Sequence, residues 1–378
     1  SPEAIVTKII NNKDITSELS LLTAYEFNLH LEFNKEVLQE ATVKSGLPDT
    51  KRYKDLRNLP LVTIDGEDAK DFDDAVFVEL ISKTPLKYRA IVAIADVSSY
   101  VIEGGYLDKE AKNRGNSTYL PGLVIPMLPH VLSNTWCSLN PNEDRAALVA
   151  DLIINNEGLI EEYSFYKAII NSKARLTYNE VELAINGNLN EKTKPLLESV
   201  IMPLYNSWQI LNKAKTRRHA LEIKSNEYKV VFNTDNSINS IVKREELVSN
   251  KIIEELMIAA NVAAAKFLQS KGLQQFTIFR IHDKPSPLKL EHLSEVLKAL
   301  AIPIKVPKNI TGQFFNNILK QYKNSELANV LNESVLGTQS QAKYSTINIG
   351  HFGLALKEYC HFTSPIRRYA DLIVHRLI

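Results

Sequence analysis

The sequence of 378 residues contains only two cysteines, Cys137 and Cys360. They form no CxxC pair, no zinc-finger spacing and no disulfide framework, so we exclude a disulfide-stapled secreted scaffold and expect a reducing, cytoplasmic environment. No apolar run approaches the roughly 18 residues of a membrane span. The N-terminus also lacks a signal-peptide pattern. These absences predict a soluble chain without a membrane partner.

A clear excess of one charge is missing as well. The 45 Lys and Arg residues nearly balance the 44 Asp and Glu residues, giving a net charge of +1. The distribution is uneven, because residues 65–80 sum to −6, whereas residues 164–177, 207–224 and 266–289 sum to +3, +4 and +4. The balance therefore excludes a uniformly basic nucleic-acid binder but not a localised site for a polyanion.

The chain has no internal repeat and no Pro- or Ser-rich linker. Residues 59–170 contain short apolar or alternating runs separated by turn signals, which predict strands, and helical patterns dominate from about residue 176 onward. The expected fold class is α+β, a mixed or antiparallel β-sheet flanked by helices. We assign residues 59–378 to one large domain and residues 1–58 to a lead-in, with a strand-like AIVTKII and a helix from Lys35 to Lys44.

Local signals mark several helix boundaries. The sequence from Thr177 to Glu180 fits a capping box, which predicts a helix start. A helical pattern over residues 196–217 contains Pro203, which predicts a kink or break. Residues 246–270 are rich in Ala and Leu and predict one long helix.

The segment TIDGEDAKDFDD is the most informative part of the chain. It places six carboxylates within ten residues, offset only by Lys70: Asp65, Glu67, Asp68, Asp71, Asp73 and Asp74. Two like charges about 4 Å apart repel by roughly 4 kcal/mol at an effective dielectric near 20, so a folded cluster needs protonation, salt bridges or a multivalent cation. A solvated acidic loop is the plain alternative. Flanking apolar runs and the abundance of aspartate favour an inward-facing Mg²⁺ or Ca²⁺ site, although the spacing is not that of an EF-hand.

A second feature lies near the C-terminus. Ser364 followed by Pro365 predicts a helix N-terminus, whose free backbone N–H groups attract anions. Arg367 and Arg368 in the expected first turn would add donors that suit phosphate. The alternative is that one of these arginines pairs with Asp371 along the same helix.

Several motifs in order closely resemble the catalytic (RNB) domain of the ribonuclease II / ribonuclease R family, and they are nearest to the ribonuclease R branch. They are TIDGEDAKDFDDAV, STYLPG, IPMLPHVLS, IEELMIAAN and HFGLALKEYCHFTSPIRRYADLIVHRLI. The resemblance runs from about Arg57 to the last residue. It implies processive 3′→5′ hydrolysis of single-stranded RNA to nucleoside 5′-monophosphates, with one or two Mg²⁺ ions that Mn²⁺ could replace.

The resemblance also implies roles for individual residues. Asp65, Asp71 and Asp74 would hold metal directly or through water, and Asp73 would be the residue most critical to the chemistry, through a second metal and the attacking water. Arg367 would contact the scissile phosphate and stabilise charge in the transition state. Glu67 and Asp68 do not match key positions of the family, so the solvated-loop interpretation stands for them.

Further matched positions are expected to contact RNA. Tyr119 in STYLPG would stack on a base, although an isolated tyrosine of this kind would otherwise be assigned to the core. Tyr178 would help to place the terminal nucleotide, and Arg368 would bind RNA beside Arg367. One of Glu254 and Glu255 would accept a hydrogen bond from a ribose 2′-OH, and the sequence does not decide which.

The chain departs from the family pattern in EYKVVF, where the family has a second clamping aromatic. The aligned position is Val230, with Tyr228 and Phe232 two residues away on the same strand face, so either the alignment slips by two residues or the clamp is one-sided. His282 and His351 have no metal-ligand spacing, and we assign them hydrogen-bonded structural or RNA-contact roles.

The leading hypothesis is a metal-dependent 3′→5′ exoribonuclease domain that acts as a monomer on single-stranded RNA, alone or with other RNA-decay proteins. A catalytically silent RNA-binding relative is the alternative, and a Ca²⁺-stabilised binding module explains only the acidic cluster. The first residue is Ser, and the resemblance implies RNA-binding barrels on either side of the catalytic domain. We therefore expect a fragment that begins at the end of a cold-shock-like barrel and stops before the last helix is complete.

Overall fold

A mixed seven-stranded sheet forms the centre of the molecule. The computed structural model describes residues 15–223, 228–233, 238–243 and 245–378, so the AIVTKII stretch lies outside the described residues. The strand order is β1-β8-β7-β4-β3-β2-β9, parallel at β1/β8 and β2/β9 and antiparallel elsewhere. The strands are β1 Lys54–Asp55, β2 Val62–Asp65, β3 Asp74–Lys83, β4 Leu86–Ala95, β7 Asp144–Asn155, β8 Ile160–Asn171 and β9 Ala174–Thr177. The predicted fold class is confirmed.

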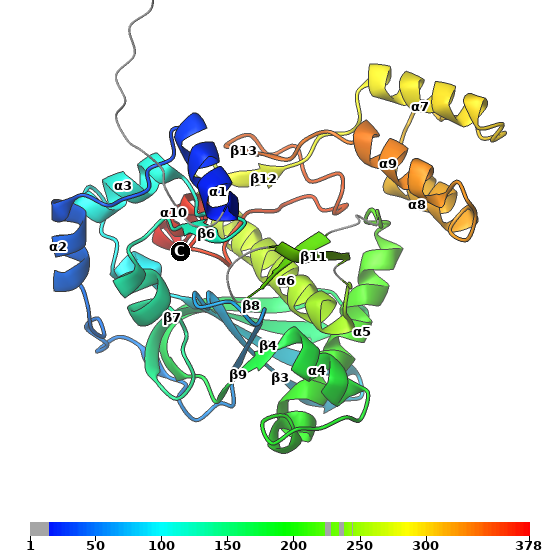
Figure 1. Cartoon of the computed structure of the whole chain (residues 1–378). Coiled ribbons are helices and arrows are strands. Elements are labelled where there is room, and N and C mark those ends of the chain that lie inside the picture. The colour runs from blue at the N-terminus through cyan, green and yellow to red at the C-terminus, as the bar shows by residue number, and fades with distance from the viewer. Residues whose placement is uncertain (1–14, 224–227, 234–237, 244) are drawn as a thin grey trace, which may run out of the picture.

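Helices cover both faces of this sheet, which explains why the central strands β4 and β7 are almost continuously apolar and buried. On one face α6 crosses the strands with α4 and α5 beside it, and the other face packs against α2, α3 and α10 (Figure 1). Their bounds are α2 Lys35–Val43, α3 Tyr106–Arg114, α4 Tyr178–Ile185, α5 Met202–Arg217, α6 Val248–Ser270 and α10 Tyr369–Leu377. None of the helices in the described residues is both long and apolar enough to cross a membrane.

Three further helices form a separate module with its own apolar core (Figure 1). They are α7 Pro287–Ala299, α8 Gly312–Gln321 and α9 Ala328–Thr338. Three two-stranded ribbons complete the structure: β5 Thr118–Leu120 with β6 Leu123–Ile125, β10 Tyr228–Phe232 with β11 Ile238–Lys243, and β12 Phe279–Ile281 with β13 Lys343–Ser345.

Local sequence signals placed most helix boundaries correctly. The capping box is present, because the Thr177 side chain accepts from the Glu180 N–H and the Glu180 carboxylate accepts from the Thr177 N–H. Pro203 lies in the first turn of α5, directly after a π-helical turn over Leu197–Ile201, so the expected break is confirmed. One helix, α1 Ile15–Glu26, was not indicated by the sequence patterns.

The expected start of the last helix at Ser364 and Pro365 is wrong. α10 begins at Tyr369, and Arg368 has extended backbone angles (φ −138°, ψ 122°). Residues 364–367 instead form a separate turn, closed by the Arg368 N–H, which donates to the Ser364 carbonyl at 3.0 Å. The chain is held extended there because residues 367–369 pair with residues 115–117, so the free N–H groups of a helix start do not lie at Ser364.

Candidate active site

The acidic cluster folds at one edge of the sheet. β2 ends at Asp65 and the antiparallel β3 begins at Asp74, which places both residues at the same end of the strand pair. Asp71 and Asp73 lie in the connecting loop, and all four aspartates line one cavity of about 1060 Å³. Asp73 is only 5% exposed. The prediction that part of the cluster faces inward is therefore confirmed.

The aspartates lack enough positive partners. Burial raises the pKa of Asp73 well above its ordinary value, although Arg367 opposes the shift. Burial and the nearby charge of Asp65 raise the pKa of Asp74 to about 7, and burial also raises the pKa of Asp65. Because each shift reflects a carboxylate whose charge is poorly compensated, a cation that enters the cavity is favoured.

The donor set fits a hard divalent cation that keeps part of its water shell. In the part of the chain that the structure describes, no three His, Cys, Asp or Glu side chains gather closely enough to form a ready-made metal cage. Mg²⁺ is commonly bound by one or two carboxylates, with water and substrate phosphate completing its octahedral shell. The aspartates of this cavity suit that kind of binding better than an all-protein Ca²⁺ cage.

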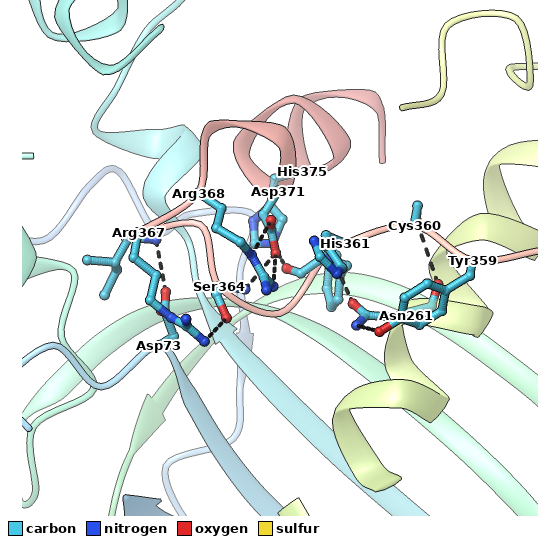
Figure 2. Close-up of polar contacts among 12 residues, drawn as sticks. Asp73, Asn261, Tyr359, Cys360, His361, Ser364, Arg367, Arg368, Asp371 and His375 are labelled. Atoms are coloured by element: carbon cyan, nitrogen blue, oxygen red, sulfur yellow. Dashed lines mark hydrogen bonds and ion pairs between the residues drawn. The ribbon is translucent and has the colours of Figure 1, made fainter. Parts of the chain in front are cut away.

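Arg367 stands beside Asp73 (Figure 2), and it lines the same cavity as the four aspartates. Its Nε atom is 3.4 Å from Asp73 Oδ2, and an Nη2–H donates to the Ser364 hydroxyl at 3.0 Å. The Ile366 N–H donates to Asp73 Oδ1 at 2.8 Å, which ties the turn to the acidic loop. The Arg367 side chain is 44% exposed, so it can also meet an anion in the cavity.

Arg368 is engaged elsewhere (Figure 2). Its Nε and Nη2 atoms both donate to the Asp371 carboxylate at 2.8 Å. Asp371 is fully buried and also accepts from the Ser364 N–H at 2.8 Å. The alternative in which one arginine pairs with Asp371 thus describes Arg368, which still lines the edge of the cavity.

Buried side chains hold the segment that leads to Arg367 (Figure 2). Asn261 on α6 accepts from the Phe362 N–H at 2.8 Å and donates to the Tyr359 hydroxyl at 3.1 Å. His375 Nε2 lies 2.7 Å from the Phe362 carbonyl oxygen. The supporting role of Asn261 was not predicted, although a lone amide within the apolar run of this helix was the available signal.

The two predicted tyrosines both face the cavity. Tyr119 is 53% exposed, so its assignment to the core is excluded, and its hydroxyl donates to Asp71 Oδ2 at 3.1 Å. It lies on the β5–β6 ribbon, where the Ser20 hydroxyl of α1 donates to the Pro121 carbonyl at 2.7 Å. Tyr178 is the first residue of α4 and lines the same cavity.

The structure distinguishes the two glutamates that the sequence left undecided. Glu254 lines the cavity and has a side chain that is 47% exposed. The Glu255 side chain is 2% exposed and lies 2.9 Å from Lys215 Nζ and 3.5 Å from Arg218 Nη2. Glu254 is therefore the glutamate that can reach a ligand, and Glu255 belongs to a buried ion cluster.

Glu255→Ala is expected to lower the free energy of unfolding by about 2–4 kcal/mol, because it leaves the partly buried Arg218 without its carboxylate and leaves Lys215 with Glu254 alone. Glu254→Ala is the matched control on the same helix, and we expect a loss of less than about 1 kcal/mol, because its ion pair with Lys215 is half exposed. Urea denaturation of both variants and the parent measures the difference. Equal stability of the two variants would contradict the assignment.

A second cavity of about 790 Å³ continues from the first and shares Asp65, Tyr119 and Tyr178 with it. Tyr228 and Val230 of β10 both line it, as expected for positions two apart on one strand face. An aromatic side chain, Tyr228, therefore lines this cavity two positions from the aligned Val230.

The chain matches the RNB domain family model over residues 53–378. The chain belongs to the RNB domain family. Ribonuclease R of Escherichia coli (strain K12) is 42% identical to this RNB domain over 344 residues, which are 90% of the chain and 42% of the relative. Ribonuclease R of Thermotoga maritima is 38% identical over 384 residues, which are 100% of the chain and 54% of the relative. The chain thus spans about half the length of these relatives.

Solved structures agree with this membership. Mycoplasma genitalium RNase R in complex with ribose methylated single-stranded RNA has a TM-score of 0.88 and 30% identity, and the match covers 97% of this chain and 57% of that one. Yeast Ssd1, a pseudonuclease, has a TM-score of 0.65 at 16% identity, covering 92% of this chain and 41% of that one, and shows similarity of fold alone.

Three segments of this RNB domain are basic, residues 164–177, 207–224 and 266–289. None of their Lys or Arg side chains that the structure describes lines either of the two connected cavities. Lys215 and Arg218 pair with Glu255, and Arg175 donates to the carbonyl of Gly66. Positive charge within the first cavity comes instead from Lys70, Arg367 and Arg368. Uneven charge along the sequence therefore did not identify the groups that face a ligand.

The two histidines take hydrogen-bonded positions, as predicted. His282 Nε2 lies 2.7 Å from the Ser340 carbonyl, and its Nδ1 accepts from the Gly353 N–H at 2.8 Å. His351 Nδ1 accepts from the Leu354 N–H at 3.1 Å, and the two imidazole rings lie with centroids 5.0 Å apart and planes tilted by 45°. Burial and the neighbouring His282 lower the pKa of His351 to about 4, so this ring is neutral near pH 7.

Proposed function

We propose that this RNB domain is a 3′→5′ exoribonuclease that hydrolyses single-stranded RNA to nucleoside 5′-monophosphates with bound Mg²⁺. The observation that carries the proposal is the convergence of Asp65, Asp71, Asp73, Asp74 and Arg367 on one cavity. Membership of the RNB family and the identity to proteins named ribonuclease R support it. Residues 59–378 are proposed as the catalytic unit.

The proposed reaction breaks the last phosphodiester bond of the RNA. A water oxygen attacks the phosphorus, the P–O3′ bond breaks, the shortened chain keeps a 3′-hydroxyl and the released nucleotide carries the 5′-phosphate. Asp65, Asp71, Asp73 and Asp74 would hold Mg²⁺ in one or two sites, and the bound ion would supply Lewis-acid activation of the water and stabilisation of the leaving oxygen. Arg367 donates to the phosphoryl oxygens, where negative charge builds up, and stays aligned through Asp73 and Ser364.

Other cavity residues are assigned to the nucleotide. The exposed ring of Tyr119 stacks on a base, which suits an enzyme that accepts every base. Tyr178 positions the terminal nucleotide, and Glu254 accepts a hydrogen bond from its 2′-hydroxyl. Tyr228 is the proposed partner of Tyr119 in enclosing the bases, in place of an aromatic at position 230. Arg368 contributes positive charge at the cavity edge while paired with Asp371.

The experiment that tests this proposal follows a 5′-labelled single-stranded RNA and the nucleotides released from it. With Mg²⁺ we expect progressive shortening from the 3′ end and nucleoside 5′-monophosphates, and with EDTA we expect neither. A 3′-phosphorylated RNA should be shortened more slowly, whereas a 5′-phosphorylated RNA should not. Intact RNA in the presence of Mg²⁺ or Mn²⁺ would instead favour a catalytically silent RNA-binding relative.

Glu254→Gln is expected to reduce the preference for RNA over DNA by about tenfold, since an amide is a weaker acceptor for the 2′-hydroxyl than a carboxylate. The measurement compares kcat/KM for RNA and for the same strand with a single 2′-deoxy residue at its 3′ end. Glu255→Gln, on the neighbouring position of the helix, is the control. An unchanged ratio in the Glu254 variant would remove this role.

A further inference from the structure

Three short extended segments lie side by side at the edge of the catalytic cavity. In the β12–β13 ribbon Arg280 stands directly opposite Tyr344. On its other side β12 pairs with the segment around Cys360, through the Phe279–Cys360 bridge and the Arg280 N–H, which donates to the Tyr359 carbonyl at 2.9 Å. The three segments therefore form a small sheet.

Alternation places one set of side chains beneath this sheet and another set above it. Phe279, Ile281 and Cys360 are 0–3% exposed and pack into the main core. The side chains between them are oriented toward the opposite face, and we call this set the aromatic strip: Tyr359, His361, Tyr344 and Arg280.

The members of the aromatic strip contact one another in order. The ring centroids of Tyr359 and His361 are 5.7 Å apart, and those of His361 and Tyr344 are 5.5 Å apart. The Tyr344 hydroxyl and His361 Nδ1 are hydrogen-bonded at 2.8 Å. The Arg280 guanidinium lies over the Tyr344 ring at 4.8 Å. The strip is therefore a continuous, internally braced row.

One end of the row is in the cavity and the other is on the surface. Tyr359 lines the cavity next to Arg368, whereas Tyr344 is 42% exposed. Burial and the nearby charge of Arg368 lower the pKa of His361 to about 3, so a neutral ring connects the two ends. Lys343 adds an exposed cation beside Tyr344.

We propose that the aromatic strip is an additional binding subsite for single-stranded RNA, in which Tyr344 and Arg280 stack on the bases immediately 5′ of the nucleotides held in the cavity. This inference rests on the proposed function, because a 3′ end inside the cavity leaves only 5′ nucleotides outside it. A sheet face that presents aromatic rings and a guanidinium plane is the usual platform for unpaired bases. Stacking does not depend on base identity, so the subsite serves any sequence.

The test measures binding in EDTA, so that the RNA stays intact and the result does not depend on hydrolysis. A fluorescent 12-nucleotide RNA and a tetranucleotide are titrated against the parent chain, Tyr344→Ala and Arg280→Ala. We expect each variant to bind the 12-mer about 5- to 150-fold more weakly, the range for loss of one stacked base. Binding of the tetranucleotide, which the cavity accommodates, should change less than about twofold.

Two matched variants separate stacking from structural damage. Tyr344→Phe keeps the ring, loses the hydrogen bond to His361, and should bind the 12-mer like the parent. Tyr106→Ala on α3 removes a tyrosine that is similarly exposed and also faced by a lysine, Lys109 Nζ at 6.0 Å from the ring centroid, and should have no effect.

Three results would overturn the subsite. They are unchanged binding of the 12-mer by Tyr344→Ala, equal weakening of both RNAs, and a loss of the same size in Tyr106→Ala. A parent chain that binds the 12-mer through the strip and releases no nucleotide with Mg²⁺ would reject the proposed function and leave the subsite standing. Photo-cross-linking of 4-thiouridine to the Tyr344 peptide, only from positions upstream of the 3′-terminal nucleotides, is the expected direct confirmation.

Discussion

Asp73→Asn is expected to lower nucleotide release at least about 10³-fold, a loss of about 4 kcal/mol of transition-state stabilisation, because the proposed metal-binding charge at the scissile phosphate disappears. The fold should remain intact. An asparagine can still accept from the Ile366 N–H through Oδ1, and it removes a carboxylate that is only 5% exposed. The melting temperature in metal-free buffer should equal or exceed that of the parent, since a buried carboxylate near other carboxylates is costly and Arg367 compensates its charge only in part.

Asp68→Asn is the matched control for this prediction. Asp68 lines the same cavity but does not match a key position of the family, so its variant should retain nucleotide release within about threefold, as expected for a position outside the catalytic set. Both variants are assayed on the same single-stranded RNA with Mg²⁺, together with thermal unfolding. Undiminished release by Asp73→Asn, or an equal loss in both variants, would reject the assigned role of Asp73.

The second large effect is a difference between two adjacent arginines, Arg367 and Arg368, in catalysis and in stability. Arg367→Ala is expected to reduce kcat about 10²- to 10³-fold, the usual loss for one donor to a developing negative charge, with little change in stability. Arg368→Ala should instead lower the stability strongly and change kcat little. Removing its guanidinium leaves the fully buried Asp371 without its ion-pair partner, which should cost about 3–5 kcal/mol of unfolding free energy.

Single-turnover rates and urea denaturation of both variants measure these opposite changes. Arg367→Lys supplies the charge without the paired donors and should recover only part of the rate. A large stability loss in Arg367→Ala would mean that its contact with Asp73 is structural. A stable Arg368→Ala variant with a strongly reduced rate would transfer the phosphate role to Arg368.

The local features of this fold were predictable from the sequence. Alternating and continuous apolar runs indicated the strands of the central sheet, the capping box marked the start of α4, and Pro203 marked the break before α5. The inward orientation of part of the acidic cluster was also predictable, because apolar strands flank the cluster on both sides. Each of these signals depends on residues a few positions apart.

Features decided by distant partners were not predictable. Glu254 and Glu255 are equivalent in the helical pattern, and Lys215 pairs with both. Only the folded structure shows that Glu255 is buried beside Arg218, at the C-terminal end of α5. The Ser364–Pro365 pair is a normal helix-start signal, yet pairing with residues 115–117 keeps the chain extended until Tyr369. The basic segments failed as indicators because several of their charges, among them Lys167, Arg175 and Lys215, pair with acids or carbonyls from distant parts of the chain.

Helix α6 sets a fixed separation between two parts of the site. It presents Glu254 to the cavity and Asn261 to the segment that leads to Arg367, seven residues and about 10 Å apart along one face. Inserting one residue between them would rotate one side chain by about 100° relative to the other. The number of residues between Glu254 and Asn261 is therefore fixed, whereas the connections within the α7–α9 module can vary in length. Alignments of the family should show gaps in that module and none across this stretch of helix.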